Sequence, residues 1–373
     1  MMTAAAAGPR VLHVMASGER GGGADHLTHV ISKLTALGVR SSVAVSGGGP
    51  LAARLEQQGV AVHRVEMMRS RLDPRAVLAL RRLVVAEAPD VVHCHGTRAA
   101  FFAALARLPA GYVYTVHGLS YRQDVSRARR AVLLAAEALA CRRARFVVSV
   151  SAADLNDLTL RGYVPPGAGR HIPNAVALDR FKPGDRRQAK ARLGLAESAV
   201  VVGTVARLVP QKAVHDLVDA VLQCEPVSLV IVGDGPLRRG LEARAAAAGA
   251  RIQFLGARDD VAAVLQAFDV FALSSRWEGE PIALLEAMAT GLPCVATATA
   301  GATEVLGEDG EAGRLVPIGA PRTMAATFAE LAADPAARER LGKTARARVE
   351  PRSWESVAAQ LARLYRDVCP TGR

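Results

Sequence analysis

The sequence predicts an α/β protein made of two doubly wound, Rossmann-like domains. Short runs rich in valine and isoleucine alternate with helix-favouring runs almost throughout the 373 residues. The strand-like runs are nearly continuously apolar, which is typical of parallel strands covered by helices on both faces. The chain also exceeds the length at which a single core usually stops growing. We therefore expect two similar parallel-sheet domains.

The predicted strands divide evenly between two halves of the chain. In the second half they cover residues 201–208, 228–235, 251–257, 269–275, 293–300 and 313–319. In the first half they cover residues 11–16, 42–47, 61–66, 91–96, 112–118, 146–151 and 170–175. The segment 174–184 carries proline and glycine and is predicted to link the domains. A helix over 354–368 closes the chain.

Composition and charge limit the class of protein. Half of the residues are apolar, but only 4% are aromatic, so the cores are built from alanine, valine and leucine. There is no 18-residue apolar window without charge, and the first ten residues lack the charged and apolar regions of a signal peptide. We expect a cytoplasmic protein. The five cysteines have no C-x-x-C spacing and are interpreted as reduced and structural: Cys94, Cys141, Cys224, Cys294 and Cys369.

No metal site is predicted from the sequence. His93, Cys94 and His95 resemble a metal-binding run. Neighbouring residues on a strand point to opposite faces, however, so these three side chains cannot all bind one ion.

The positive charge belongs to the first half. Residues 1–176 carry 22 Lys and Arg against 11 Asp and Glu, a net of +11 out of +12 for the chain. Two interpretations of this charge stay open. The arginines form a surface that binds anionic lipid headgroups, or they occupy solvated faces and are frequent because the genome is GC-rich. Nucleic acid is disfavoured because aromatic residues do not interleave with the arginines. These arginines are Arg69, Arg71, Arg75, Arg81, Arg82, Arg122, Arg127, Arg129, Arg130, Arg142, Arg143 and Arg145.

The stretch 264–304 holds the strongest functional pattern. An apolar strand is followed by Glu278-Gly279-Glu280-Pro281 and then by a helix predicted over 282–290. Pro281 suits the first helical turn, and Glu286 lies about one and a half turns further on. Two carboxylates, Glu278 and Glu286, would then border a helix N-terminus with free N–H groups. Such a site can hold hydroxyl groups and an anion.

Three other strand-to-helix turns carry candidate chemistry. Arg207 and Lys212 flank the turn after strand 201–208 and suit a diphosphate. Cations are unfavourable near the positive N-terminal end of a helix unless an anion is bound there. The run 18–23 is G-x-x-G-G-G, which is not a dinucleotide fingerprint; it either brings backbone N–H groups to phosphate oxygens or is only a tight turn. His117 ends strand 112–118, where a lone histidine is usually packing or surface.

Together these motifs resemble the retaining GT-B glycosyltransferases of nucleotide-sugar family 4 over nearly the whole chain. The resemblance implies the GT-B architecture, with two domains facing across a cleft. Residues 1–176 would bind the acceptor, residues 177–354 the nucleotide sugar, and residues 355–373 would pack back on the first domain. The motifs are residues 21–23, 115–118, 171–174 with 180–183, 205–208 leading to Lys212, 232–236, and 278–281 through 286–288.

The resemblance also implies a role for each candidate residue. Arg207 and Lys212 would hold the donor diphosphate, which Gly22 or Gly23 would approach, and Glu286 the ribose hydroxyls. Glu278, the backbone of residues 279–282 and His117 would contact the donor sugar. The implied catalytic residues are His117, Arg207, Lys212 and Glu278. The implied donor-binding residues are Gly22, Gly23, Arg207, Lys212, Gly279, Glu280, Pro281, Ile282 and Glu286.

The implied activity is retaining, metal-independent transfer of a hexose from a nucleotide-diphosphate sugar, a UDP-sugar rather than a GDP-sugar. No cofactor is expected. The acceptor would be a lipid-linked sugar or another cell-envelope glycan precursor, met at the inner face of the membrane. Alternatives are a GT-B epimerase or phosphorylase and a non-catalytic nucleotide-sugar-binding protein. The chain departs from the family where glycine is usual, at Ala175, Ala213 and Ala300. At Glu280 an apolar residue is usual, so Glu280 would add a third carboxylate to the sugar pocket.

Overall fold

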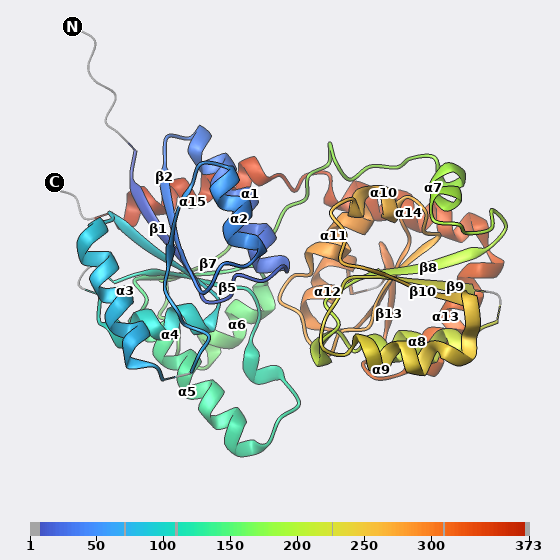
Figure 1. The fold of residues 1–373 in the computed structure, drawn as a ribbon, viewed down its shortest axis with the longest axis horizontal. Helices are drawn as coiled ribbons and strands as arrows, with labels where there is room; N and C mark the ends of the chain where they lie inside the picture. The colour runs from blue at the N-terminus through green and yellow to red at the C-terminus, as the bar shows by residue number, and fades with distance from the viewer. Residues whose placement is uncertain (1–7, 71, 109–110, 226, 309, 370–373) are drawn as a thin grey trace, which may run out of the picture. The chain divides into compact units, whose positions relative to one another are not determined.

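The computed structural model describes residues 8–70, 72–108, 111–225, 227–308 and 310–369, so Arg71 lies outside the described residues. These residues form two compact units. Unit 1 comprises the described residues up to Asn174 together with those from Trp354 onward, and unit 2 comprises Ala175–Ser353. Each unit holds a parallel sheet with helices on both faces (Figure 1). The prediction of two doubly wound, Rossmann-like domains is therefore confirmed.

Unit 1 is built on a sheet that, in its described part, has seven strands in the order β3-β2-β1-β4-β5-β6-β7. The strands are β1 (Arg10–Met15), β2 (Arg40–Val45), β3 (Ala61–Arg64), β4 (Val91–His95), β5 (Val113–Val116), β6 (Phe146–Ser149) and β7 (Gly169–His171). The helices are α1 (Gly22–Ala36), α2 (Pro50–Gln57), α3 (Pro74–Glu87), α4 (Thr97–Ala106), α5 (Arg127–Arg143), α6 (Ala152–Leu160) and α15 (Trp354–Val368), with a 3₁₀ turn η1 (Ser120–Arg122).

Unit 2 repeats this plan with six described strands in the order β10-β9-β8-β11-β12-β13. They are β8 (Val200–Val205), β9 (Val227–Val232), β10 (Ile252–Gly256), β11 (Val270–Leu273), β12 (Cys294–Thr297) and β13 (Gly313–Val316). The helices are α7 (Arg186–Arg192), α8 (Val214–Leu222), α9 (Arg238–Ala245), α10 (Val261–Leu265), α11 (Ile282–Ala289), α12 (Ala300–Leu306), α13 (Pro321–Ala333) and α14 (Pro335–Val349), with 3₁₀ turns η2 (Pro210–Lys212) and η3 (Ala246–Arg251).

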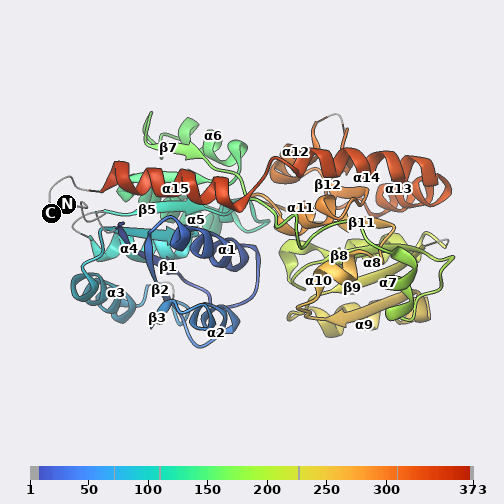
Figure 2. The same ribbon diagram turned by 90° about the horizontal axis from the view of Figure 1, so that it is seen from above.

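The final helix, α15, belongs to unit 1 although it follows unit 2 in the sequence. It lies beside α1 in both views (Figures 1 and 2). Its buried side includes Trp354, Leu361 and Tyr365, which recur at helical spacing. The chain thus returns to its first unit to complete the core there.

The two faces of the unit 1 sheet differ in chemistry. Alternate residues of β1 and β4, such as Leu12, Val14 and Cys94, pack into an apolar core with α3, α4 and α5. The residues between them, His13, His93 and His95, are also buried, on the opposite face. Buried histidines therefore lie within unit 1, close to a further apolar core that includes Met15 and Leu27.

Unit 2 has apolar cores on both sides of its sheet. Phe271 and Leu273 of β11 pack in one core with residues of α11 and α14, while Val270 and Ala272 pack in the other with residues of α8 and α13. The start of β11 is fixed by Asp269, whose Oδ2 accepts a 2.8 Å hydrogen bond from Val201 N and lies 2.8 Å from Lys190 Nζ. The hydrogen bond joins the start of β11 to β8, and the buried ion pair joins it to α7.

Two further observations bear on the sequence predictions. All five cysteines are free thiols. No helix in the described part of the chain has the length and apolar character needed to cross a membrane.

Candidate active site

The strand order of unit 2 reverses between β8 and β11, and ligands of doubly wound proteins bind at the carboxyl ends of strands at such a point. The turn after β8 carries Arg207 and runs into η2, which ends at Lys212. The turn after β11 carries Glu278 and runs into α11. Residues about 70 apart in the sequence therefore meet at one edge of the sheet.

Lys212 and Glu278 form an ion pair at this edge. Lys212 Nζ lies 2.5 Å from Glu278 Oε1, and their side chains are only 16% and 7% exposed. Ser275 Oγ donates a second hydrogen bond, also 2.5 Å long, to the same oxygen. Because the pair is largely shielded from water, its attraction is much less screened than that of a surface pair. The carboxylate is thus held by two donors.

The backbone of the two turns is also tied together. Ser274 Oγ donates to the carbonyl oxygens of Lys212 at 2.8 Å and Ala213 at 3.0 Å. Gln211 Nε2 donates to Trp277 O at 3.0 Å. Ala213 has a φ of 44°, in the left-handed region that costs a side chain about 1–2 kcal/mol. A glycine at this position would avoid that cost.

Arg207 is placed by contact between two backbone turns. Leu208 N donates a 2.9 Å hydrogen bond to Asp234 O in the turn after β9. Gly233 has a φ of 127°, and a Cβ there would lie 1.9 Å from Ala206 O, so this contact requires glycine. The Arg207 side chain is exposed, and within the described residues it makes no side-chain hydrogen bond or ion pair. Its guanidinium can bind an anion.

The remaining predicted donor residues surround the start of α11. Pro281 is the N-cap residue of α11, and Glu286 is half-buried in its second turn. Gly279 lies under α12, where a Cβ added at Gly301 would come within 1.7 Å of Gly279 O. The helix α12 therefore packs directly against the turn that carries Glu278.

The position of Glu280 differs from the prediction of a third carboxylate in a sugar pocket. Its side chain is 1% exposed and forms an ion pair with Arg352, which is 19% exposed. The negative charge is neutralised by the segment that precedes α15. Glu280 can contact a donor through its backbone, whereas its carboxylate serves this ion pair.

In unit 1 the structure brings Gly22, Gly23 and His117 together. The two glycines lie in the first turn of α1, directly after the β1 turn. A Cβ on Gly23 would lie 3.8 Å from His117 Cδ2, and burial lowers the pKa of His117 well below its ordinary value. The imidazole beside the glycine-rich turn is therefore neutral near pH 7.

Sequence reasoning did not associate other histidines with His117. His95 Nδ1 lies 3.3 Å from His117 Nε2, and the His26 ring centroid lies 4.9 Å from that of His117. The H-x-H spacing of His93 and His95 does predict side chains on one face of a strand. Their neighbours His13 and His26 come from β1 and α1, which the sequence pattern alone does not place.

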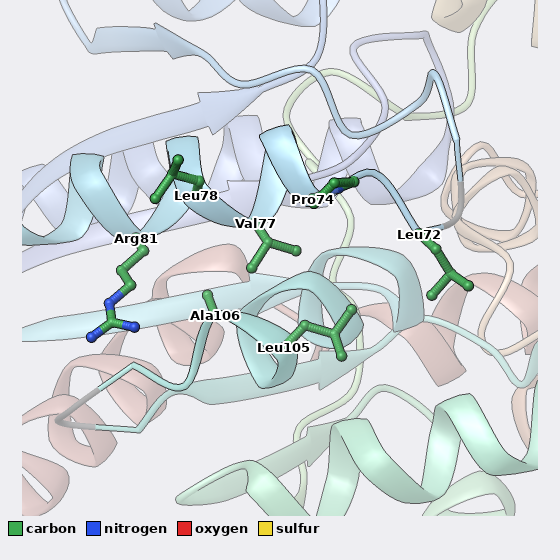
Figure 3. Close-up of a pocket in the computed structure, with 7 residues that line it drawn as sticks. All are labelled: Leu72, Pro74, Val77, Leu78, Arg81, Leu105 and Ala106. Atoms are coloured by element: carbon green, nitrogen blue, oxygen red, sulfur yellow. The ribbon is translucent and has the colours of Figure 1, made fainter.

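An apolar groove of about 280 Å³ lies elsewhere on unit 1, between α3 and α4 (Figure 3). Leu72 and Leu78 are 69% and 48% exposed, and Arg81 lies at the same groove. Exposed apolar side chains grouped beside a cation are typical of an interaction surface. The lining residues are Leu72, Pro74, Val77, Leu78, Arg81, Leu105 and Ala106.

Two protein-family models match the chain, one mainly in each unit. The model of the family "Glycosyl transferases group 1" matches residues 185–348, and that of "Glycosyl transferase 4-like domain" matches residues 21–175. A D-inositol 3-phosphate glycosyltransferase of Saccharomonospora viridis is 30% identical over 304 residues, which cover 74% of this chain and 70% of that protein. The chain belongs to the group 1 glycosyltransferase family, as the sequence motifs predicted.

Other relatives match over shorter segments. The UDP-Gal:alpha-D-GlcNAc-diphosphoundecaprenol alpha-1,3-galactosyltransferase of Escherichia coli is 32% identical over 60% of this chain, and the lipopolysaccharide core biosynthesis glycosyltransferase LpsE of Rhizobium meliloti is 33% identical over 52%. The chain spans 61% and 54% of the length of these two relatives.

Solved structures support the fold. Anabaena HepE in complex with UDP and glucose superposes with a TM-score of 0.84 at 24% identity, covering 96% of this chain and 100% of that one. Sucrose-phosphate synthase from Thermosynechococcus elongatus gives 0.82 at 23% identity, covering 96% and 99%.

The Glu280–Arg352 pair predicts a stability effect in unit 2. Arg352→Leu should lower the free energy of unfolding by about 3–5 kcal/mol, because it leaves a buried carboxylate without this partner. The double variant Glu280→Leu/Arg352→Leu should lie within about 1 kcal/mol of wild type, since no buried charge remains. Denaturant unfolding measures both, and a double variant as unstable as Arg352→Leu would contradict the assignment.

Proposed function

We propose that this chain is a retaining, metal-independent hexosyltransferase that uses a nucleotide-diphosphate sugar, a UDP-sugar in preference to a GDP-sugar. Unit 2 binds the donor and unit 1 the acceptor. The observation that carries the proposal is the pair of turns at the strand-order reversal of unit 2, where Lys212 contacts Glu278 and Arg207 is free to bind an anion. Membership of the glycosyltransferase family supports it.

Binding of the donor diphosphate is assigned to two cations of different geometry. The guanidinium of Arg207 can form two parallel hydrogen bonds to phosphate oxygens, and Lys212 supplies a compact charge. When phosphate replaces Glu278 as the partner of Lys212, Glu278 becomes available to a hydroxyl of the donor sugar. The two cations then neutralise the charge that develops on the leaving diphosphate, which is the task a metal ion performs in other transferases.

The remaining donor contacts are proposed from the sequence motifs. Glu286 accepts hydrogen bonds from the ribose hydroxyls. The backbone of residues 279–282 at the start of α11 holds the sugar, together with the neutral imidazole of His117. Gly22 and Gly23 lack side chains and let the backbone of α1 approach the diphosphate.

The configuration is retained because the acceptor hydroxyl attacks the anomeric carbon from the same face as the one from which the leaving group departs. The acceptor hydroxyl oxygen bonds to the anomeric carbon as the bond from that carbon to the diphosphate oxygen breaks. The acceptor proton passes to an oxygen of the leaving diphosphate, which balances the charge of the step. In this mechanism the two glutamates position the donor and exchange no proton.

The acceptor is proposed to be a lipid-linked sugar or another cell-envelope glycan precursor. The relative from Escherichia coli is named for a UDP-sugar donor and a diphosphoundecaprenol-linked acceptor. A relative from Corynebacterium glutamicum, 31% identical over 52% of this chain, is named as GDP-mannose-dependent, so the base must be tested directly. The charge of residues 1–176 and the apolar groove beside Arg81 suit an anionic membrane surface reached from the cytoplasm.

The donor site is tested by removing one contact at a time. Lys212→Ala and Glu286→Ala should each lower kcat/KM for sugar transfer by about 30- to 1,000-fold, which corresponds to about 2–4 kcal/mol of transition-state stabilisation. Lys343→Ala removes an exposed lysine of the same unit and should leave turnover unchanged. Unchanged turnover in both site variants would refute the assignment.

The same assay separates transfer from its rivals. Free nucleoside diphosphate should form only when acceptor is present, and activity should persist in the presence of a chelator. Release of nucleoside diphosphate without acceptor would favour hydrolysis, and conversion of the donor sugar without such release would favour an epimerase.

Membrane association predicts a lipid preference. At low salt the chain should co-sediment with phosphatidylcholine vesicles that contain phosphatidylglycerol and remain free with phosphatidylcholine alone, because the attraction is electrostatic. Leu72→Ser/Leu78→Ser should weaken the association. Leu160→Ser, at a 79% exposed leucine of α6 in the same unit, serves as the matched control. Equal binding to neutral and anionic vesicles would overturn the lipid assignment.

A further inference from the structure

Five histidines of unit 1 gather beside the glycine-rich turn: His13 on β1, His26 on α1, His93 and His95 on β4, and His117 after β5. Four of them are buried, and His117 is half-buried. One nitrogen each from His26, His95 and His117 lie within 4.8 Å of one another, and so do one each from His13, His93 and His95. The proposed sugar contact involves only His117, so it does not account for the other four histidines.

Hydrogen bonds decide which of the two groups can bind an ion. His93 Nδ1 is 2.7 Å from the Tyr365 hydroxyl, and His93 Nε2 is 2.7 Å from Thr115 Oγ1. Both nitrogens of His93 are therefore engaged with hydroxyl groups, and a metal would have to displace one of these partners. In the other group, the contact that a metal would replace lies between two of its own members, His95 and His117. The group that contains His93 is the poorer candidate.

His26 has the opposite arrangement. Its Nδ1 lies 2.8 Å from Asn174 Oδ1, and an amide oxygen only accepts, so Nδ1 carries the proton and Nε2 carries the lone pair. Within the described part of the chain this buried Nε2 has no hydrogen-bond partner. Burial lowers the pKa of His26 to about 4, so the ring is neutral near pH 7. A buried, oriented lone pair without a partner is costly unless it binds something.

His95 and His117 supply two more nitrogens at a suitable separation. His95 Nδ1 and His117 Nε2 are 3.3 Å apart, close to the edge of about 3.3 Å of a tetrahedron with zinc–nitrogen bonds of ~2.05 Å. His95 Nε2 lies 3.1 Å from His13 Nδ1. When His95 Nδ1 binds a metal, Nε2–H can donate to His13, as Nδ1–H of His26 donates to Asn174. Metal-binding histidines almost always donate their second nitrogen in this way.

We propose that His26, His95 and His117 form a binding site for one zinc ion in unit 1. Three imidazoles suit zinc and leave a fourth position for water or a substrate oxygen. The ion is separate from the proposed transfer, which needs no metal. Because His117 is shared, zinc competes with the sugar contact assigned to that residue.

Zinc binding is measured on the full chain without an affinity tag and without substrates, so the result does not depend on sugar transfer. The chelator-stripped protein is titrated with zinc against a chromophoric competitor, and with cobalt to detect a tetrahedral visible spectrum. Wild type should bind one zinc ion per chain. His26→Gln and His117→Gln should each weaken binding by about 10-fold or more.

Matched controls come from histidines of the same unit. His29→Gln lies one turn further along α1, and His171→Gln lies on β7; both should bind zinc as wild type does. Circular dichroism and thermal midpoints verify the fold of each variant, and His117, being half-buried, gives a variant that should fold even if His26→Gln does not. Absence of stoichiometric zinc in wild type, or a loss caused by His93→Gln but not by His26→Gln, would overturn the proposal.

Discussion

The ion pair between Lys212 and Glu278 is the interaction on which the arrangement of unit 2 depends. It joins the turn after β8 to the turn after β11 at the point where the strand order reverses. Ser274 joins the same two turns through the carbonyl oxygens of Lys212 and Ala213, and Ser275 holds the Glu278 carboxylate within the second turn. A pair this well shielded is stable without substrate, yet both partners have a use once a diphosphate arrives. The pair therefore fastens the two turns, and in the proposed function it also holds two of the side chains that receive the donor.

The fold was predictable because its signals are local. Apolar runs such as residues 269–275 mark strands buried on both faces, and Pro281 marks the start of α11, where the structure makes it the N-cap residue. Family membership was predictable because glycines, cations and glutamates occur in a fixed order. The charge partner of Glu280 was not predictable, because Arg352 lies 72 residues away and no sequence pattern relates the two residues.

The histidines of unit 1 illustrate the same limit. The sequence argument considered His93, Cys94 and His95 together and correctly separated Cys94, which packs in the apolar core. It could not supply His13 and His26, since these come from β1 and α1 and meet β4 only through the strand order β2-β1-β4. Tertiary pairing, rather than spacing along the chain, creates the cluster. The site that matters for metal binding is therefore visible only in the structure.

The central claim is that the paired turns of unit 2 form a nucleotide-sugar site, and nucleotide binding measured by thermal shift tests it most directly. UDP and UDP-sugars should raise the melting temperature of wild type more than UMP, uridine or GDP do, because the diphosphate contacts both cations. The shift should be absent from an Arg207→Ala/Lys212→Ala variant when it is measured against that variant's own melting temperature without ligand, which loss of the Lys212–Glu278 pair lowers. A shift that survives in that variant, or no shift with any nucleoside diphosphate, would contradict the account.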